Sequence, residues 1–136
     1  MKYLFVDTAG WMSMADRSDQ RHLDAIRIRD EWLEQGGLLV TTDYVVDETL
    51  TLIRMRLGLE AAEKWWQQIS GSPRLQVEWV DAERADKAVG WFFRWKDQSF
   101  SFTDCTSFVV MRELKLKKVL TSDKHFNTAG FQTMPR

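Results

Sequence analysis

Cysteine and proline are scarce in this 136-residue sequence, which contains one cysteine, Cys105, and two prolines. A single cysteine cannot form a disulfide within the chain, and it argues against a zinc site built from cysteine thiolates. Few prolines, no internal repeat and no low-complexity tract leave no segment that resembles a linker. We therefore expect a single domain over residues 1–136, which is within the usual size range for one domain.

Strong net charge and long apolar runs are also missing. The net charge of −1 provides no bulk positive field that would attract the chain to nucleic acid or to acidic membranes. The N-terminal apolar run ends at Asp7, which is too short for a signal peptide, and no stretch approaches the length of a membrane span. We expect a cytoplasmic protein without a membrane partner. An enzyme acting on nucleic acid is still allowed, because bound cations can supply positive charge.

Apolar residues, by contrast, are abundant: 44% of the chain is hydrophobic, with seven Trp and eight Phe, which argues against disorder. Short apolar runs predict buried strands, and amphipathic segments predict helices between them. Strands that alternate with helices indicate an α/β fold with a mostly parallel central sheet of four to five strands, flanked by helices. The expected strands are 3–6, 38–40, 75–80, 118–121 and an edge strand at 131–133. The expected helices are 9–14, 20–34, one from a cap at 41–43 to 57, 60–69, 82–95, and one from 103 or 104 to 114.

Three aspartates lie at positions where this fold would bring side chains together. Asp7 follows the first strand and Asp123 follows the fourth, so both emerge at the carboxyl ends of parallel strands, where ligands bind in open sheets. Asp104 stands near the start of a helix, where the helix dipole favours a carboxylate. Taken alone, each of the three has a purely structural alternative, which is a helix cap.

Glu48 gives the most independent signal. At about 100° per residue, it falls among Val45, Leu52 and Met55, at the apolar edge of its helix. A carboxylate there is expected to be partly buried and to need a partner, and no lysine or arginine is evident for it in the sequence. The two interpretations are a half-exposed helix residue and a ligand of a metal ion shared with the aspartates.

Four carboxylates at one place suit a hard divalent cation. Mg²⁺ and Mn²⁺ prefer carboxylate and water oxygens, whereas packed carboxylates without a cation repel one another and take up protons. A metal ion held in this way polarises a phosphodiester and lowers the pKa of a bound water that attacks phosphorus. The sequence therefore predicts a metal-dependent hydrolase site formed by Asp7, Glu48, Asp104 and Asp123.

The motifs around these acids resemble those of the PIN-domain family, and in particular its VapC-type ribonuclease toxins. The resemblance covers essentially the whole chain and rests, in order, on Phe5-Val6-Asp7-Thr8, Val46-Asp47-Glu48-Thr49-Leu50, Ser101-Phe102-Thr103-Asp104 and Leu120–Phe126. It implies a PIN-like three-layer sandwich and an endoribonuclease that uses Mg²⁺, or Mn²⁺ as a substitute. It also implies a small antitoxin protein as a partner, and a homodimer.

Carried over position by position, the resemblance makes Asp7, Glu48 and Asp104 the direct metal ligands. Asp123 becomes a fourth acid that often coordinates through water. Hydroxyl side chains that orient carboxylates or waters are implied at Thr8, Thr103 and Thr121. The sequence departs from the family pattern at Ala9, where Ser or Asn is frequent, and at residues 105–107, which are more polar than usual.

Basic residues near the acids are candidates for holding an RNA backbone, with solvated surface charges as the alternative. These candidates are Arg54, Arg56, Lys118 and Lys124. Both histidines are expected at the surface, His125 beside a core phenylalanine and His22 in solvent. Exposed members of the aromatic run 91–102, together with Trp65-Trp66, would suit an antitoxin helix or a second subunit.

Other function classes fit parts of the sequence. A catalytically silent or stand-alone PIN module would act in RNA binding or RNA processing without an antitoxin, although the complete acid set argues against silence. A phosphatase of the haloacid dehalogenase type also opens on apolar residues followed by Asp-Thr, but it needs a second aspartate at position 9, which is Ala9. The phosphate loop G-x-x-x-x-G-K is absent, which excludes the common nucleoside triphosphatases.

Overall fold

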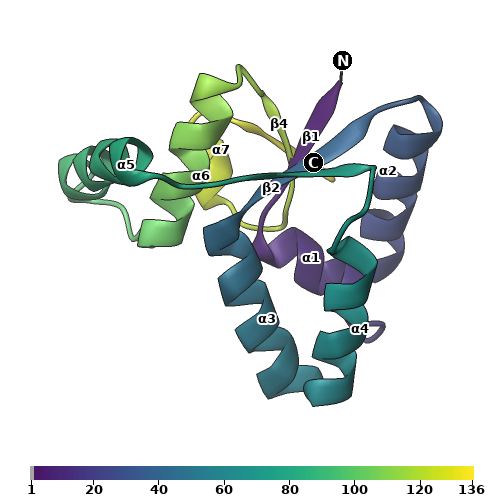
Figure 1. Cartoon of the computed structure of the whole chain (residues 1–136). Helices are drawn as coiled ribbons and strands as arrows, with labels where there is room; N and C mark the ends of the chain where they lie inside the picture. Colours follow the sequence, from purple (N-terminus) through teal and green to yellow (C-terminus); the bar gives the residue numbers. More distant parts are fainter. Residues whose placement is uncertain (1) are drawn as a thin grey trace.

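A parallel sheet forms the centre of the computed structural model, which describes residues 2–136 (Figure 1). Its five strands are all parallel and lie in the order β3-β2-β1-β4-β5. They are β1 (Tyr3–Val6), β2 (Leu38–Thr42), β3 (Leu75–Glu78), β4 (Lys118–Leu120) and β5 (Gln132–Met134). The prediction of an α/β fold with a mostly parallel sheet is confirmed.

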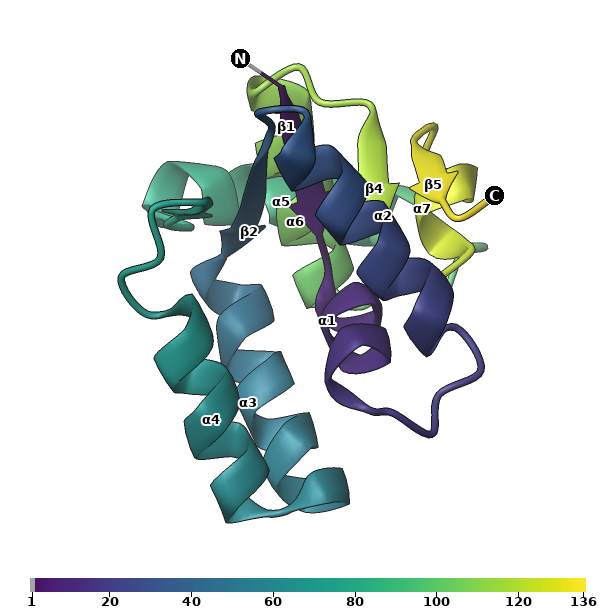
Figure 2. The ribbon, with the colours of Figure 1, turned by 90° about the vertical axis from the view of Figure 1, so that its right-hand side faces the viewer.

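Helices connect every pair of consecutive strands, as parallel pairing requires. They are α1 (Thr8–Ala15), α2 (His22–Glu34), α3 (Asp43–Leu57), α4 (Leu59–Ile69), α5 (Ala82–Arg94), α6 (Phe102–Glu113) and α7 (His125–Thr128). In Figure 2, α2 lies in front of the sheet and α5 and α6 lie behind it. The pair formed by α3 and α4 extends beyond the carboxyl ends of β1 and β2 (Figure 1). Within residues 2–136, no helix combines the length and the apolar character needed to cross a membrane.

The structure moves several element boundaries and adds one helix. β2 continues through Thr41 and Thr42, because both side chains are fully buried in the sheet and Thr42 then caps α3 by accepting from the backbone N–H of Val45. Helix α6 begins at Phe102 rather than at 103 or 104, since Ser101 is its N-cap. Helix α7 was not predicted, because four residues are too few to show a helical period.

An aromatic cluster joins α6, α7 and the loop before α6. Phe108 is fully buried and packs edge-on against both Phe100 and Phe126, with ring centroids 5.0 Å apart in each pair. Phe131 stacks on the same ring at 5.7 Å. The cluster therefore fixes the loop at 95–101 and the start of α7 relative to the N-terminal end of α6, where Asp104 lies.

Helix α1 lies directly against the end of β4. Gly10 is buried, and a Cβ atom at this position would overlap the carbonyl oxygen of Leu120. Only glycine allows the backbones to approach this closely. The contact brings Asp7, at the start of α1, next to Thr121, at the end of β4.

Candidate metal centre

The strand order places the ends of β1 and β4 at a topological switch point. From β1 the chain runs outward through β2 and β3 on one side, and then returns to place β4 and β5 on the other side. Ligands of open α/β sheets bind outside the carboxyl ends of the strands at such a point. Asp7 follows β1 directly, and Asp123 lies in the turn after β4. Both acids therefore lie at the place where the topology favours a site.

All four predicted acids line one pocket of about 310 Å³: Asp7, Glu48, Asp104 and Asp123. They come from the end of β1, the middle of α3, the first turn of α6 and the turn after β4. Two of the predicted hydroxyl residues, Thr8 and Thr103, also line the pocket. The fold therefore brings together in one pocket four acids that are far apart in the sequence.

Asp7 is buried and accepts two hydrogen bonds. Its Oδ1 accepts from the backbone N–H of Gly10 at 2.9 Å, which makes Asp7 the N-cap of α1. Its Oδ2 accepts from the hydroxyl of Thr121 at 2.8 Å, and this hydroxyl oxygen in turn accepts from the backbone N–H of Asp123 at 2.9 Å. Thr121 therefore connects Asp7 to Asp123. Asp7 caps a helix and lines the pocket at once, so the two interpretations of this residue are not exclusive.

The acids disfavour one another's charge. The pKa of Asp7 is raised to about 7, mainly by burial and to a smaller extent by the nearby carboxylates of Asp123 and Asp104, while hydrogen bonds from Gly10 and Thr121 act in the opposite direction. Burial is also the main cause that raises the pKa of Asp104, with Asp123 adding to it. Oxygen ligands that repel one another in a buried pocket fit a hard divalent cation, which would neutralise them.

Glu48 is half-buried and lines the pocket between Val45 and Leu52, as its helical position predicted. The apolar edge is narrower than expected, because Met55 is 74% exposed. Arg56, two turns after Glu48 on the same side of α3, lines the same pocket. The sequence offers no evident lysine or arginine partner for Glu48, and the described residues contain no ion pair between Glu48 and Arg56.

The four basic residues predicted to hold RNA lie at different places. Only Arg56 lines the pocket. Lys124 is exposed and follows Asp123, and Arg54 is exposed on another side of α3. Lys118 begins β4 at the end of the sheet opposite the acids, where its Nζ lies 5.7 Å from the ring centroid of Trp32.

Both histidines are half-buried rather than at the surface, although His125 does pack against the buried Phe100 and precede the buried Phe126, as expected of a histidine beside a core phenylalanine. His125 contacts two of the acids, with its Nδ1 at 3.2 Å from Asp104 and 3.3 Å from Asp123. His22 is half-buried, and its Nδ1 lies 2.9 Å from the carbonyl oxygen of Ser13, so the expectation that it is solvent-exposed is wrong. The contacts of His125 with Asp104 and of His22 with Ser13 join separate segments, which sequence periodicity does not relate.

Sequence reasoning also missed pocket residues that carry polar groups. Ser107, Ser122 and Asp19 line the pocket. The hydroxyls of Ser107 and Thr8 are buried and have no hydrogen-bond partner among the described residues. Ser107 follows Asp104 by three residues on α6, so helical spacing was a signal for it. Asp19 lies in the connection between α1 and α2, for which no comparable signal exists.

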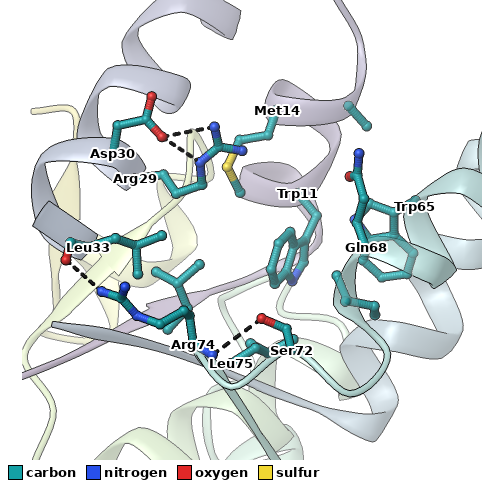
Figure 3. Close-up of a pocket in the computed structure, with 13 residues that line it drawn as sticks. Trp11, Met14, Arg29, Asp30, Leu33, Trp65, Gln68, Ser72, Arg74 and Leu75 are labelled. Carbon is teal, nitrogen blue, oxygen red and sulfur yellow. Dashed lines mark hydrogen bonds and ion pairs between the residues drawn. The ribbon is translucent and has the colours of Figure 1, made fainter. Parts of the chain in front are cut away.

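A second pocket, of about 390 Å³, lies apart from the acids and is largely apolar (Figure 3). It is formed by α1, α2, α4 and β3, and its lining includes Trp11, Met14, Leu33 and Trp65. The rings of Trp11 and Trp65 pack edge to face at 5.6 Å. None of the four acids lines this pocket.

Comparison with known proteins agrees with this geometry. A family model described as PIN domain matches residues 4–132. The chain is 34% identical over 128 residues to the 23S rRNA-specific endonuclease VapC20 of Mycobacterium tuberculosis, covering 94% of this chain and 95% of that protein. It is 32% identical over 124 residues to a VapC ribonuclease of Archaeoglobus fulgidus, covering 90% and 78%.

A solved structure shows the same fold. The crystal structure of Mycobacterium tuberculosis VapC20, described as a Sarcin-Ricin loop cleaving toxin, matches with a TM-score of 0.86 at 32% identity, covering 95% of this chain and 96% of that one. The chain therefore belongs to the PIN-domain family. Within that family its relatives are VapC-type ribonucleases, and the predicted PIN-like fold is confirmed.

The charge of Asp7 should destabilise the metal-free fold at high pH. The pKa of Asp7 rises from 3.8 to about 7 on folding. Ionisation of Asp7 therefore lowers the free energy of unfolding progressively as the pH rises from about 4 to about 7, and this loss of stability is complete above about pH 7. Asp7→Asn removes the charge and keeps a capping acceptor. With a chelator present, we expect this variant to have a higher Tm than the parent at about pH 8, and the difference to disappear near pH 4. Thermal unfolding across this range measures it. Equal Tm values for Asp7→Asn and the parent at pH 8 would contradict the raised pKa of Asp7. The control is Asp47→Asn, which removes an exposed charge.

Proposed function

We propose that this chain is an endoribonuclease that hydrolyses RNA phosphodiester bonds with Mg²⁺, for which Mn²⁺ substitutes. The observation that carries the proposal is the convergence of Asp7, Glu48, Asp104 and Asp123 on one pocket at the switch point of the sheet. The relatives' names, an endonuclease and a ribonuclease, support the same reaction.

Each pocket residue would have a distinct task. Asp7, Glu48 and Asp104 would hold the cation directly, and Asp123 would hold it through water. A bound cation supplies a water of lowered pKa and neutralises charge on the phosphate. Thr121 fixes the Asp7 carboxylate by its hydrogen bond, and Arg56 is the basic side chain of the pocket that is placed to contact a substrate phosphate. The unpartnered hydroxyls of Thr8 and Ser107 are placed to bind water in the pocket.

We further propose that the substrate is a structured ribosomal RNA, and that the protein acts in the cytoplasm. The support is that one relative is a 23S rRNA-specific endonuclease, whose crystal structure is that of a Sarcin-Ricin loop cleaving toxin. A site with five acidic side chains, Asp19 included, and one basic side chain offers few contacts to an extended RNA backbone. This favours recognition of a compact RNA shape over a long electrostatic footprint.

Nuclease activity should depend on the pocket acids and on a divalent cation. Purified protein should cut ribosomal RNA with Mg²⁺ or Mn²⁺ and stop when a chelator is added. Glu48→Gln should lower the rate by more than about 100-fold, because loss of a direct ligand costs more than loss of an outer residue. The matched control is Asp47→Asn, which removes the neighbouring, exposed charge on α3 and should leave the rate within about twofold. If Glu48→Gln cuts RNA as fast as Asp47→Asn, the assignment of Glu48 to the metal site is wrong. If the wild-type chain binds RNA without cutting it, the silent PIN module replaces the nuclease.

We also propose that a small antitoxin protein inhibits this chain, because a structural relative is described as a toxin. The apolar pocket of Figure 3 is the surface that suits an apolar side chain of such a partner. Tryptophan and methionine side chains line it, and residue types of this kind are enriched in the centres of protein interfaces. A chain that acts alone, without an antitoxin, would need no partner at this place.

A larger, charged side chain at the edge of the apolar pocket should weaken antitoxin binding. Gln68 lines the pocket and is exposed, whereas the adjacent Gln67 is exposed outside it. The candidate antitoxin is the product of a small gene beside the gene for this chain, where one is found. Gln68→Arg should reduce affinity for that product by about tenfold, or about 1.4 kcal/mol, while Gln67→Arg should not. Calorimetric titration of both variants tests this. Nuclease activity should be the same in the two, and equal affinities would show that the partner docks elsewhere.

We also propose that the chain forms a homodimer. Helix α5 packs mainly on α6 and stands at one end of the molecule (Figure 1). Its outer side carries Val89, Phe92 and Phe93 at helical spacing, and all three are exposed. An exposed apolar helix face of this kind suits a two-fold contact, in which the same surface is used by both copies.

Disruption of the α5 surface should produce a monomer. Phe93 is 65% exposed, so Phe93→Glu places a charge in the proposed contact with little effect on the core. Light scattering should give the mass of a dimer for the parent and of a monomer for this variant. Trp66→Glu is the control, because Trp66 is 47% exposed on α4 and should not alter the mass. A parent chain that is monomeric at micromolar concentration would contradict the dimer.

A further inference from the structure

We propose, on the basis of the metal-dependent function above, that His125 is a positioning residue of the metal centre. Its ring holds the carboxylates of Asp104 and Asp123 so that each keeps one oxygen free for a ligand. Ligand atoms of these three residues lie within 4.8 Å of one another. They come from two segments, the first turn of α6 and the turn that leads from β4 into α7.

The hydrogen bonds of His125 determine which ring nitrogen carries the proton. Nδ1 lies 3.2 Å from Oδ2 of Asp104 and 3.3 Å from Oδ1 of Asp123. Ionised carboxylates only accept hydrogen bonds, so Nδ1 donates its proton to Asp104, while Asp123 is a close polar contact of the same nitrogen rather than a second hydrogen-bond partner. Nε2 lies 3.2 Å from Oγ of Ser99, and in the neutral ring with its proton on Nδ1 this nitrogen accepts from the hydroxyl. One imidazole thus connects the loop before α6, the start of α6 and the turn after β4.

The same bonds divide the carboxylate oxygens into two kinds. Oδ2 of Asp104 also accepts from the backbone N–H of Ser101 at 3.1 Å, and Oδ1 of Asp123 also accepts from the backbone N–H of His125 at 2.9 Å. The opposite oxygens, Oδ1 of Asp104 and Oδ2 of Asp123, receive no hydrogen bond from the described residues. The donors therefore select one oxygen of each acid for structure and leave the other for a ligand.

Packing keeps the His125 ring in this orientation. The ring stands edge-on to Phe100 at a centroid distance of 5.3 Å and an interplanar angle of 86°. Phe100 and Phe126, which follows His125, both belong to the aromatic cluster around Phe108. Both neighbours are buried, so they support the imidazole from the side of the core.

His125 fits the role of a hydrogen-bond donor better than that of a metal ligand. The nitrogen that faces the acids is Nδ1, and a nitrogen that carries a proton has no lone pair for a metal ion. The other nitrogen is used by Ser99. Outer residues that orient ligating carboxylates in this way commonly change metal affinity or activity by 10–100-fold when they are replaced.

Metal binding by His125 variants tests the assignment without a nuclease assay. Mn²⁺ affinity is measured by electron paramagnetic resonance for the parent, His125→Leu, His125→Asn and His22→Leu. Leucine removes both nitrogens, whereas asparagine keeps an N–H donor close to the place of Nδ1. We expect His125→Leu to weaken Mn²⁺ binding by about tenfold or more and His125→Asn to recover most of the loss. His22→Leu is the control, because His22 bonds to Ser13 and lines no part of the acid pocket.

Each other outcome overturns the assignment in a recognisable way. Parent-like affinity in His125→Leu shows that the ring does not position the acids. Equal losses in the leucine and asparagine variants, with unchanged Tm, show that the N–H donor is not the cause. Hyperfine coupling between Mn²⁺ and ¹⁵N-labelled His125 would make it a direct ligand. A parent chain that binds Mn²⁺ but cuts no RNA contradicts the nuclease alone, and one that binds no Mn²⁺ overturns both proposals.

Discussion

The hydrogen bond between Thr121 and the buried carboxylate of Asp7 is the contact on which the pocket depends. It joins the end of β1 to the end of β4, which are neighbouring strands at the centre of the sheet. The same hydroxyl oxygen accepts a hydrogen bond from the backbone N–H of Asp123, so Asp123 is connected to Asp7 as well. The contact forms only because α1 can lie against Leu120, which requires glycine at position 10. Burial of Asp7 raises its pKa to about 7, so this arrangement carries an electrostatic cost that a bound cation would offset.

Backbone capping and ligand binding are compatible at all three aspartates, because a carboxylate has two oxygens and about four lone-pair positions. Asp104 forms a capping box with Ser101 through one oxygen, and Asp123 accepts the N–H of His125 through one oxygen. Asp7 uses both oxygens, each for one bond, and keeps lone pairs on both. The capping bonds thus hold each carboxylate at the pocket. Such preorganisation lowers the cost of binding a cation, since the acids need not be ordered by it.

The gathering of the acids could be predicted from the sequence because it depends on local rules. A carboxylate after a parallel strand or at a helix start lies at one edge of the sheet, whatever the strand order. Strand direction also indicates that Lys118, at the first position of β4, lies far from Asp123, which follows the strand. The prediction placed Lys118 near the acids because it did not take strand direction into account. The contacts of His125 had no such signal, because they depend on the path of the loop at 95–101, which the aromatic cluster around Phe108 sets through contacts distant in sequence.

Charge distribution limits how this pocket can recognise RNA. The chain has a net charge of −1, and four acids and Asp19 line the pocket beside a single arginine, Arg56. Without a cation, these charges repel a phosphate, so the cation would be needed for substrate binding as well as for the reaction. Lys118, at the opposite end of the sheet, cannot compensate for this repulsion at the pocket. Under the proposed function, affinity would come from a few phosphates close to the cation, and discrimination from an RNA shape that brings those phosphates together, such as a loop.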